Sequence, residues 1–401
     1  MNAPASSYVR WFADIRLADV PLVGGKNASL GELYSSLTTA GINVPNGFAL
    51  TAEAYRDAVS PSAVAGRLHQ LFDGLDRSNI AQLVERAAAA RSIVYEATAG
   101  ELLRNQAAAA YRQLERQYGP GVAVAVRSSA TAEDLPNASF AGQHDSFLNV
   151  RGETALFEAC RRCFASIFTD RAIVYRADNG FDHFKVALSV GVMKMVRADL
   201  ASSGVAFTLD TESGFRDVVF ITGIYGLGEN IVQGRADPDE FYVHKPTYKR
   251  GFRAVLRRTL GKKQLRMIYG DGGNGETTRS VETDENERRR YCLSDAEVLK
   301  LAGDAIAIED HYSAVAGHAM PMDIEWAKDG DDGQIYVIQA RPETVASQRQ
   351  VAFFETYALD GSGPLLVTGR AVGEKIAAGP VRIVTGRSVL GTFVPGEVLV
   401  A

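Results

Sequence analysis

The stretch that most constrains the fold is Met322–Thr344, which has the pattern of two strands joined by a tight turn. In MDIEWA apolar and acidic residues alternate, so Asp323 and Glu325 fall on one face of a strand. In VIQARP the same alternation places Gln339 and Arg341 together. The intervening KDGDDG is typical of a hairpin turn, so the two strands are expected to pair. Two carboxylates, an amide and an arginine then share one surface.

That surface has the chemistry that a magnesium nucleotide requires. Carboxylate and amide oxygens are hard ligands for Mg²⁺, and a guanidinium neutralises phosphate. A solvated face with a salt bridge would account for one such pair. It accounts poorly for two strands that carry the same polarity beside an apolar face. The hairpin therefore predicts a site for Mg²⁺ and phosphate.

A second polar stretch, Ala125–Val150, begins where an apolar run leads into Arg127. Small hydroxyl residues follow, and then a loop that contains Gly142 and Ser146. A strand that delivers an arginine into such a loop suits a polyanion, because the guanidinium takes phosphate oxygens in a bidentate fork. Small residues also let backbone N–H groups approach the anion. By itself the stretch is equally consistent with a polar turn that carries a surface arginine.

A glycine turn near the N-terminus places Lys26 before a helix expected at about 28–39. The helix dipole and the free N–H groups of a first turn favour anions at that position. The glycine-lysine-hydroxyl element of a Walker P-loop is absent. A solvated lysine after a tight turn is the alternative interpretation.

The remaining chain mixes helical and strand patterns. Residues 61–118 and 155–179 have helical periodicity, and Cys160 and Cys163 in the second region are expected in the core, because no second ligand pair follows at zinc-site spacing. Residues 270–286 are polar and glycine-rich and are expected to form a loop. Strands are expected in five apolar runs: 186–196, 201–209, 217–222, 241–243 and 262–268.

Length and composition exclude several classes of protein. A chain of 401 residues is expected to form two or more domains or lobes. The net charge of −5 gives nucleic-acid binding little electrostatic support, so no nucleic-acid partner is expected. No apolar run reaches the roughly 18 residues of a membrane span, so no membrane partner is expected either. Three cysteines and the lack of a signal-peptide pattern indicate the cytoplasm.

Six motifs together resemble the N-terminal ATP-binding domain of the phosphoenolpyruvate synthase (pyruvate, water dikinase) family of PEP-utilising enzymes. They follow the family order over nearly the whole chain: Gly24-Gly25-Lys26, Arg127–Asp134, Phe140–Gln143, Gly226–Glu229, Met322–Trp326 and Gln339–Thr344. Other dikinases and rifampicin phosphotransferase are alternatives within the same enzyme family. A non-catalytic ATP-binding module is the alternative from another class.

The resemblance implies an α+β, ATP-grasp fold in which two lobes close on ATP between antiparallel sheets. It implies that Lys26 binds phosphate, and that Arg127 and Arg341 complete a catalytic cationic clamp. It also implies Mg²⁺ ligands at Glu325 and Gln339, with support from Asp323.

Four further contacts with the nucleotide are implied by the same resemblance. Gly142 and Ser146 would contact phosphate from their loop. The strand that ends at Met195 and Val196 would offer backbone hydrogen bonds to adenine. Glu229, in a glycine turn, would reach the ribose.

The family pattern also implies a domain division: a nucleotide-binding domain at 1–345 with a helical insertion at about 61–118, a linker at 346–368, and the truncated start of a swivelling phosphohistidine domain at 369–401. The family's acceptor histidine lies in a T-C-H motif that this sequence lacks. The chain is therefore expected to be part of a longer, homodimeric enzyme that binds pyruvate through a C-terminal domain. That enzyme would convert ATP, pyruvate and water to AMP, phosphoenolpyruvate and phosphate.

Overall fold

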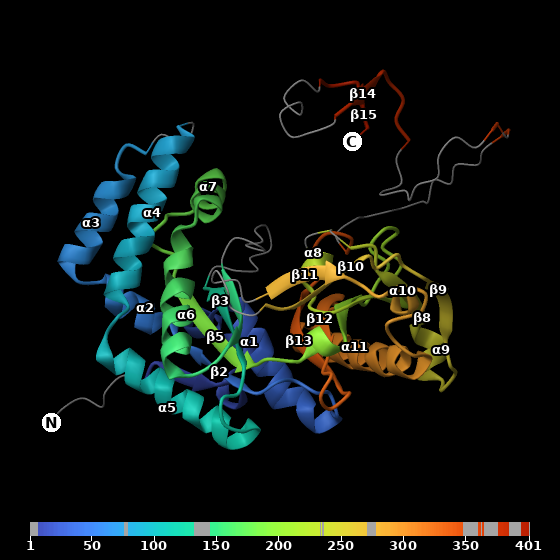
Figure 1. The fold of residues 1–401 in the computed structure, drawn as a ribbon, viewed down its shortest axis with the longest axis horizontal. Helices are drawn as coiled ribbons and strands as arrows, with labels where there is room; N and C mark the ends of the chain where they lie inside the picture. Colours follow the sequence, from blue (N-terminus) through green and yellow to red (C-terminus); the bar gives the residue numbers. More distant parts are fainter. Residues whose placement is uncertain are drawn as a thin grey trace.

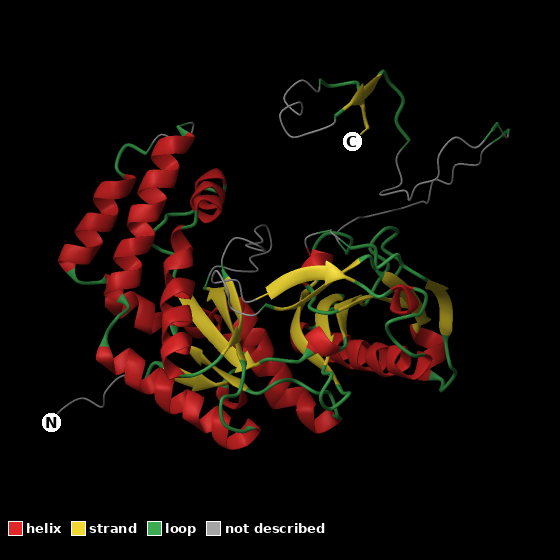
Figure 2. Ribbon diagram, viewed as in Figure 1, coloured by secondary structure: helices red, strands yellow, loops and turns green. Residues whose placement is uncertain are grey.

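The two large sheets of the computed structural model are antiparallel and lie side by side, each in its own lobe (Figure 1). It describes residues 7–75, 79–131, 145–232, 234, 236–270, 278–347, 360–361, 363–364, 376–384 and 394–400. Helices gather around the first sheet, and one long helix lies against the second (Figure 2). The mixture of antiparallel sheets with segregated helices confirms the predicted α+β class.

The first sheet is buried on both faces because alternate residues enter two different cores. Val124 and Val126 belong to a cluster formed with the helical side of the lobe, whereas Ala125 belongs to the cluster on the opposite face. The strand order is β1-β2-β5-β3-β4, with bounds β1 Val9–Trp11, β2 Gly47–Leu50, β3 Val124–Ala130, β4 Ser146–Val150 and β5 Leu188–Lys194.

Six helices form the helical side of this lobe: α2 Ala52–Val59, α3 Ser62–Phe72, α4 Ile80–Ala97, α5 Glu101–Tyr118, α6 Glu153–Ala165 and α7 Asp170–Asp178. Three of them occupy the region 61–118, where helical periodicity was expected. Cys160 and Cys163 of α6 are fully buried in this core, as predicted, and burial raises the pKa of both thiols. They have the environment of structural cysteines.

The opposite face of the first sheet is covered by α1, Val20–Leu37. This helix begins earlier than predicted, and Gly24 interrupts it with φ 74° and ψ 167°. Such a conformation is essentially restricted to glycine. The predicted glycine turn is therefore confirmed, and Lys26 lies in the first turn of the helical segment that follows it.

The second sheet has the order β13-β12-β6-β7-β8-β9, and all its pairs are antiparallel. Helix α11, Asp295–Ala316, packs against one face, where Ile324 and Trp326 are fully buried. A capping box formed by Ser294 and Glu297 begins this helix. The strand bounds are β6 Ser202–Phe207, β7 Val218–Tyr225, β8 Asp239–His244, β9 Val255–Thr259, β12 Met322–Lys328 and β13 Ile335–Pro342.

The prediction of a loop over 270–286 was partly wrong. Residues 278–282 form β11, Thr278–Glu282, which pairs residue by residue with β10, Leu265–Tyr269. Strand β10 begins later than predicted because Lys263 has φ 42° and buries its ammonium against Asp239. Three short helices complete this lobe: α8 Glu229–Val232, α9 Lys245–Lys249 and α10 Glu285–Arg288.

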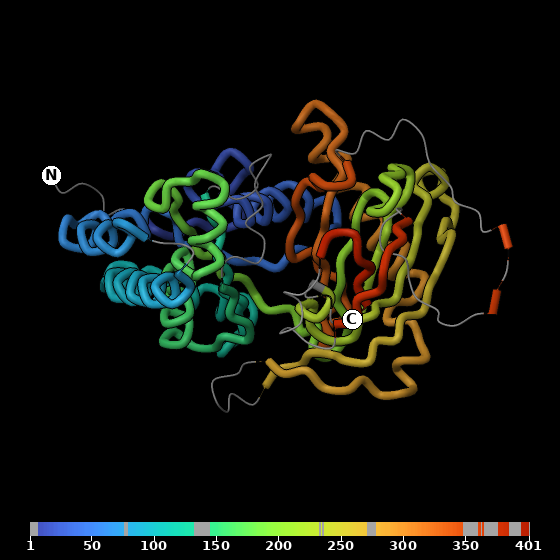
Figure 3. The backbone as a smooth tube through the Cα atoms, turned by 90° about the horizontal axis from the view of Figure 1, so that it is seen from above, coloured from blue at the N-terminus to red at the C-terminus, as the bar shows by residue number. Residues whose placement is uncertain are grey.

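The two lobes meet where α1 and the chain that follows it lie along β13, the edge strand of the second sheet (Figure 3). Ser29 donates its hydroxyl to the carbonyl of Ala340. The backbone carbonyl of Asn43 accepts a hydrogen bond from the Val337 amide at 2.9 Å. The side-chain amide of Asn43 donates to the Ile335 carbonyl at 3.1 Å. Backbone groups of the edge strand are therefore occupied by the first lobe.

Near the C-terminus, β14 Val381–Ile383 and β15 Val398–Val400 pair in parallel. The domain boundaries proposed around them stay predictions. Within the described residues, no helix has both the length and the apolar character to cross a membrane.

Substituting alanine for Gly24 is expected to destabilise the fold by about 2–4 kcal/mol. A Cβ there would lie 2.3 Å from the Ser129 hydroxyl oxygen and 2.4 Å from its carbonyl oxygen, in a backbone conformation that alanine avoids. Urea unfolding at neutral pH measures the change. The matched control is Gly41→Ala, where φ is also positive (85°) but nothing lies within 4 Å; equal losses in the two variants would contradict the close-approach explanation.

Replacing Glu32 with glutamine is expected to cost about 1–2 kcal/mol at pH 7. Burial raises the pKa of Glu32, but hydrogen bonds from His311, Ser36 and the Leu17 amide outweigh burial, so the net pKa is lowered. A lowered native pKa contributes stability above the unfolded-state pKa, and that stability is lost as pH falls through the native pKa. The loss of stability in Glu32→Gln should thus become smaller as pH falls. Urea unfolding at several pH values measures this change.

The control for this prediction is Asp310→Asn, which removes an exposed carboxylate from α11. Its effect should be close to zero at every pH. A pH-independent deficit in Glu32→Gln would show that the carboxylate charge is not what stabilises the contact between α1 and α11.

Candidate functional site

The glycine turn of α1 is locked onto β3 by small polar residues. Gly24 approaches the Ser129 backbone so closely that a side chain has no room. The Asn27 amide donates to the Ser129 hydroxyl at 3.2 Å, and its side chain donates to the Ser189 hydroxyl at 3.0 Å. These buried bonds fix the position of the intervening Lys26 relative to β3.

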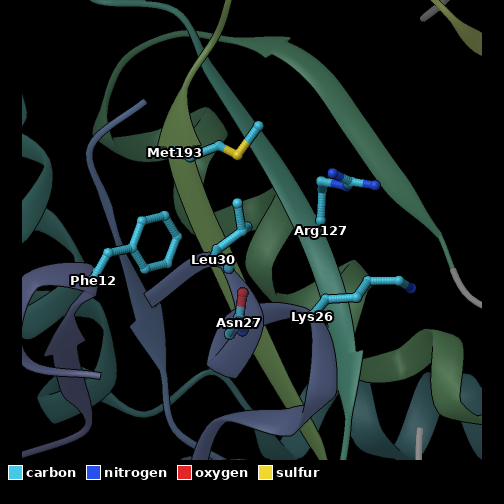
Figure 4. A pocket seen from close by; sticks show the side chains of 7 residues that line it. Phe12, Lys26, Asn27, Leu30, Arg127 and Met193 are labelled. Carbon is cyan, nitrogen blue, oxygen red and sulfur yellow. The ribbon is translucent and has the colours of Figure 1, made fainter. Parts of the chain in front are cut away.

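Lys26 and Arg127 line one small pocket, and both side chains point to the same side of it (Figure 4). Lys26 comes from α1 and Arg127 from β3. The other lining residues are Phe12, Asn27, Leu30, Gly191 and Met193. The structure thus brings together two of the three cationic residues predicted from the sequence.

Arg127 lies in the middle of β3, which corrects the expectation that it follows a strand. Strand β3 continues to Ala130 because its residues pair with β5 as far as Ala130 opposite Leu188. Ser146 was expected in a loop, but it is the first residue of β4 and lies opposite Arg127. The arginine is therefore held by a strand on each side, which gives it a fixed backbone.

From this position Arg127 reaches the second lobe. Its Nη2 lies 2.7 Å from the Gln339 side-chain oxygen and 3.3 Å from a carboxylate oxygen of Glu325. Its Nη1 donates to the Ile338 carbonyl at 3.3 Å. One guanidinium therefore bridges the two sheets.

The predicted hairpin is confirmed, residue by residue. Glu325 pairs with Gln339, and Asp323 pairs with Arg341. Ile338 is the extra residue of a bulge opposite Glu325 and Trp326. All four polar side chains lie on the face of β12 and β13 away from the buried Ile324 and Trp326, as the alternation predicted.

Asp323 and Arg341 form an ion pair of their own. The Asp323 carboxylate accepts from Nε and Nη2 of Arg341 at 2.9 and 2.8 Å. Burial nevertheless raises the pKa of Asp323, because the favourable charge of Arg341 offsets only part of the desolvation. Asp323 is thus engaged by Arg341 and stands beside the Glu325–Gln339 pair.

The oxygen atoms of Glu325 and Gln339 fit a hard cation that is completed by other ligands. No group of three or more histidine, cysteine, aspartate or glutamate side chains in the described residues could hold a metal by itself. Mg²⁺ commonly uses one or two carboxylates together with phosphate oxygens and water. The donor set therefore suits a metal that arrives with a polyphosphate.

The connection that follows β5 differs from its prediction. The strand ends at Lys194, so Met195 and Val196 lie beyond it. The Met195 amide donates to the Ala123 carbonyl, and the Val196 carbonyl accepts from the Ala198 amide. Within the described residues, the Met195 carbonyl and the Val196 amide make no hydrogen bond. One acceptor and one donor at these two residues are therefore not used by the described part of the chain.

The structure leaves two other predicted residues untested. Glu229 is half-buried at the start of α8 and forms no ion pair with any described residue. Gly142 lies outside the described residues. Neither role is tested by the structure.

Comparison with known proteins adds an independent finding. Residues 20–358 match the model of the family described as pyruvate phosphate dikinase, AMP/ATP-binding domain. The chain belongs to this family. The match spans both lobes, including Lys26, Arg127 and the polar hairpin.

Curated relatives of this family member are named phosphoenolpyruvate synthase. The chain is 50% identical to that of Synechocystis over 400 residues, 52% identical to that of Pseudomonas aeruginosa over 395 and 46% identical to that of Escherichia coli over 400. These alignments cover 98–100% of this chain but 49% of each relative. The chain thus spans about half the length of the curated relatives that it matches, and it aligns with an ATP-binding domain.

Sequence reasoning missed the residues that position the cations. Asn27, Ser129 and Ser189 form a buried polar network and were not identified as part of the site. The available signal was the small polar residue directly after Lys26 and the second serine after Arg127. Small residues at such positions mark close backbone approach as readily as ligand contact.

Replacing Arg341 with methionine is expected to cost about 2–3 kcal/mol at pH 7, because it leaves the largely buried Asp323 carboxylate without its partner. The pKa of Asp323 is already raised and should rise further in the variant. Because the native pKa lies above the unfolded-state pKa, the full loss of stability is present at a pH above the native pKa and disappears below the unfolded-state pKa. The loss of stability in Arg341→Met should therefore shrink as pH falls.

Urea unfolding of Arg341→Met and of the double variant Arg341→Met, Asp323→Asn measures this effect. The second substitution should restore most of the lost stability, because the amide carries no charge. A double variant as unstable as the single one would show that Arg341 stabilises by packing alone.

Proposed function

We propose that the two lobes form an ATP-grasp site that binds Mg-ATP and supplies its phosphoryl group. The observation that carries the proposal is the contact of Arg127 with Glu325 and Gln339. This contact brings a phosphate-binding cation and two oxygen ligands from different lobes to one place. The match to an AMP/ATP-binding domain supports the choice of nucleotide.

The residues of the site divide into charge-neutralising and metal-holding groups. Lys26, Arg127 and Arg341 would bind the phosphates, and Glu325 with Gln339 would hold Mg²⁺, with Asp323 positioned beside them through its pair with Arg341. Bound Mg²⁺ would supply further positive charge at the phosphate oxygens. Fixed cations aimed at those oxygens lower the barrier because they need no reorientation as charge develops.

The nucleotide base and the sugar would be held by the remaining groups. The Met195 carbonyl and the Val196 amide offer the acceptor and donor that an adenine edge requires. Ser146, opposite Arg127 in the strand ladder, and Gly142 would contact phosphate. Glu229 would bind the ribose.

For the full-length protein we propose the phosphoenolpyruvate synthase reaction. ATP, pyruvate and water would give AMP, phosphoenolpyruvate and phosphate, by way of a histidine that accepts the β-phosphate. The names of the curated relatives support this reaction. Pyruvate binding, a homodimeric state and a cytoplasmic location belong to the same proposal.

Calorimetric titration of the 401-residue chain with ATP, with and without Mg²⁺, tests the nucleotide site. We expect binding that depends on Mg²⁺ and that weakens by about 10- to 100-fold in Glu325→Ala. The control is Asp310→Ala, which removes an exposed carboxylate from α11 and should bind normally. Absence of ATP binding by a protein with a native circular dichroism spectrum would overturn the proposal.

A further inference from the structure

The guanidinium of Arg127 stands among the oxygen atoms that the proposed function assigns to the metal. It lies 2.7 Å from the Gln339 oxygen and 3.3 Å from the Glu325 carboxylate, and the Ile338 carbonyl accepts a third bond. Among the described residues, Arg127 is the one basic side chain within ion-pair distance of Glu325. A cation of the protein itself thus contacts both predicted metal ligands.

The position of that guanidinium is set by the fold. Strand β3 is paired on both sides at Arg127, and α1 packs on the same face of the sheet. The side chains of Arg127 and Glu325 are only 19% and 26% exposed, so solvent screens their attraction incompletely. An arginine cannot lose its charge at physiological pH, so this contact is always that of a cation.

A metal ion and the guanidinium cannot share these ligands at low cost. Two positive centres about 4 Å apart repel strongly in a partly buried site. Gln339 would also have to exchange a short hydrogen bond for a metal bond. Free Mg²⁺ would therefore have to compete with the Arg127 guanidinium, which is already paired with the Glu325 carboxylate.

A polyphosphate changes that balance because it offers the guanidinium a better partner. Phosphate oxygens can accept two parallel hydrogen bonds from a guanidinium. The pocket that Arg127 and Lys26 line together lies next to this guanidinium (Figure 4). Arg127 would then leave Glu325 and Gln339, and their oxygens would become available to the metal that the phosphates carry. The Glu325 carboxylate keeps a positively charged partner throughout the exchange, because the metal ion takes the place of the guanidinium.

We propose that Arg127 acts as an internal counterion that closes the metal ligands to free Mg²⁺ and opens them only to a metal bound to polyphosphate. This inference rests on the proposed function and adds a specificity-determining role for Arg127. It predicts an order of events in which nucleotide contact with Arg127 precedes or accompanies metal binding. It also predicts that loss of Arg127 strengthens the binding of free metal and weakens the binding of polyphosphate.

The test is titration of the 401-residue chain with Mn²⁺ alone, followed by electron paramagnetic resonance, in the absence of nucleotide. Arg127→Met should bind Mn²⁺ at least about tenfold more tightly than the unmodified protein, because the competing charge is gone. Arg127→Lys retains the charge and should show a much smaller gain. Arg258→Met, which removes a surface arginine paired with Asp295, controls for the change in net charge and should show no gain.

The gain must also depend on Glu325. Adding Glu325→Gln to Arg127→Met should abolish it. A gain that persists in that double variant would place the metal elsewhere and overturn the inference, as would equal Mn²⁺ affinities in Arg127→Met and Arg258→Met.

A second measurement uses the unmodified protein, so its result does not depend on whether a variant folds. The Nε–H resonance of Arg127 in ¹⁵N-arginine-labelled protein should move on addition of ATP with a chelator present, and should stay unmoved in millimolar Mg²⁺ alone. Movement with Mg²⁺ alone would overturn the inference. Because the Mn²⁺ titrations contain no nucleotide, failure of Mg-ATP binding by the unmodified protein would instead count against the proposed function.

Discussion

The close approach of α1 to β3 at Gly24 and Ser129 is the contact on which the rest of the site depends. Only a residue without a side chain fits there, and the backbone conformation of Gly24 is one that other residues avoid. Asn27 donates two further buried hydrogen bonds, one to Ser129 of β3 and one to Ser189 of the neighbouring strand β5. The ammonium of Lys26 and the guanidinium of Arg127 consequently start from backbones that are fixed against each other.

Helix α1 also determines how the lobes meet. One of its faces packs on the first sheet, and Ser29 and Glu32 contact β13 and α11 of the second lobe. The hydrophobic cluster on this side is continuous, running from α1 into the second sheet and α11. A displacement of α1 would thus move Lys26 and the lobe interface together, which couples the geometry of the pocket to the relation between the lobes.

Much of the fold and part of the site could be predicted because the signals are local. The polar face of the hairpin follows from period-two alternation on either side of a short turn, and the pairing of Glu325 with Gln339 confirms it. The capping box of α11 and the glycine turn before Lys26 are equally local. The edge strand β9 was missed because its sequence, VLRRT, has three exposed residues and no clean alternation.

The contacts that assemble the site could not be predicted by such reasoning. Arg127 meets Glu325 across 198 residues of sequence, and Glu32 meets His311 across 279. No periodicity encodes which lobe faces which. The position of Arg127 within β3 was misjudged for a related reason, since small hydroxyl residues favour loops by composition but here continue the ladder with β5.

The coverage of β13 has a consequence for the association state of the protein. An unpaired edge strand is a template onto which another chain can add, and natural proteins protect such edges. Here Asn43, Ser29 and Arg127 occupy carbonyl and amide groups along the outer edge of β13. If the lobes separated widely, those groups would be uncovered and could recruit a strand from a neighbouring molecule. The contacts that shape the pocket therefore also guard against aggregation, and they favour small lobe movements over wide ones.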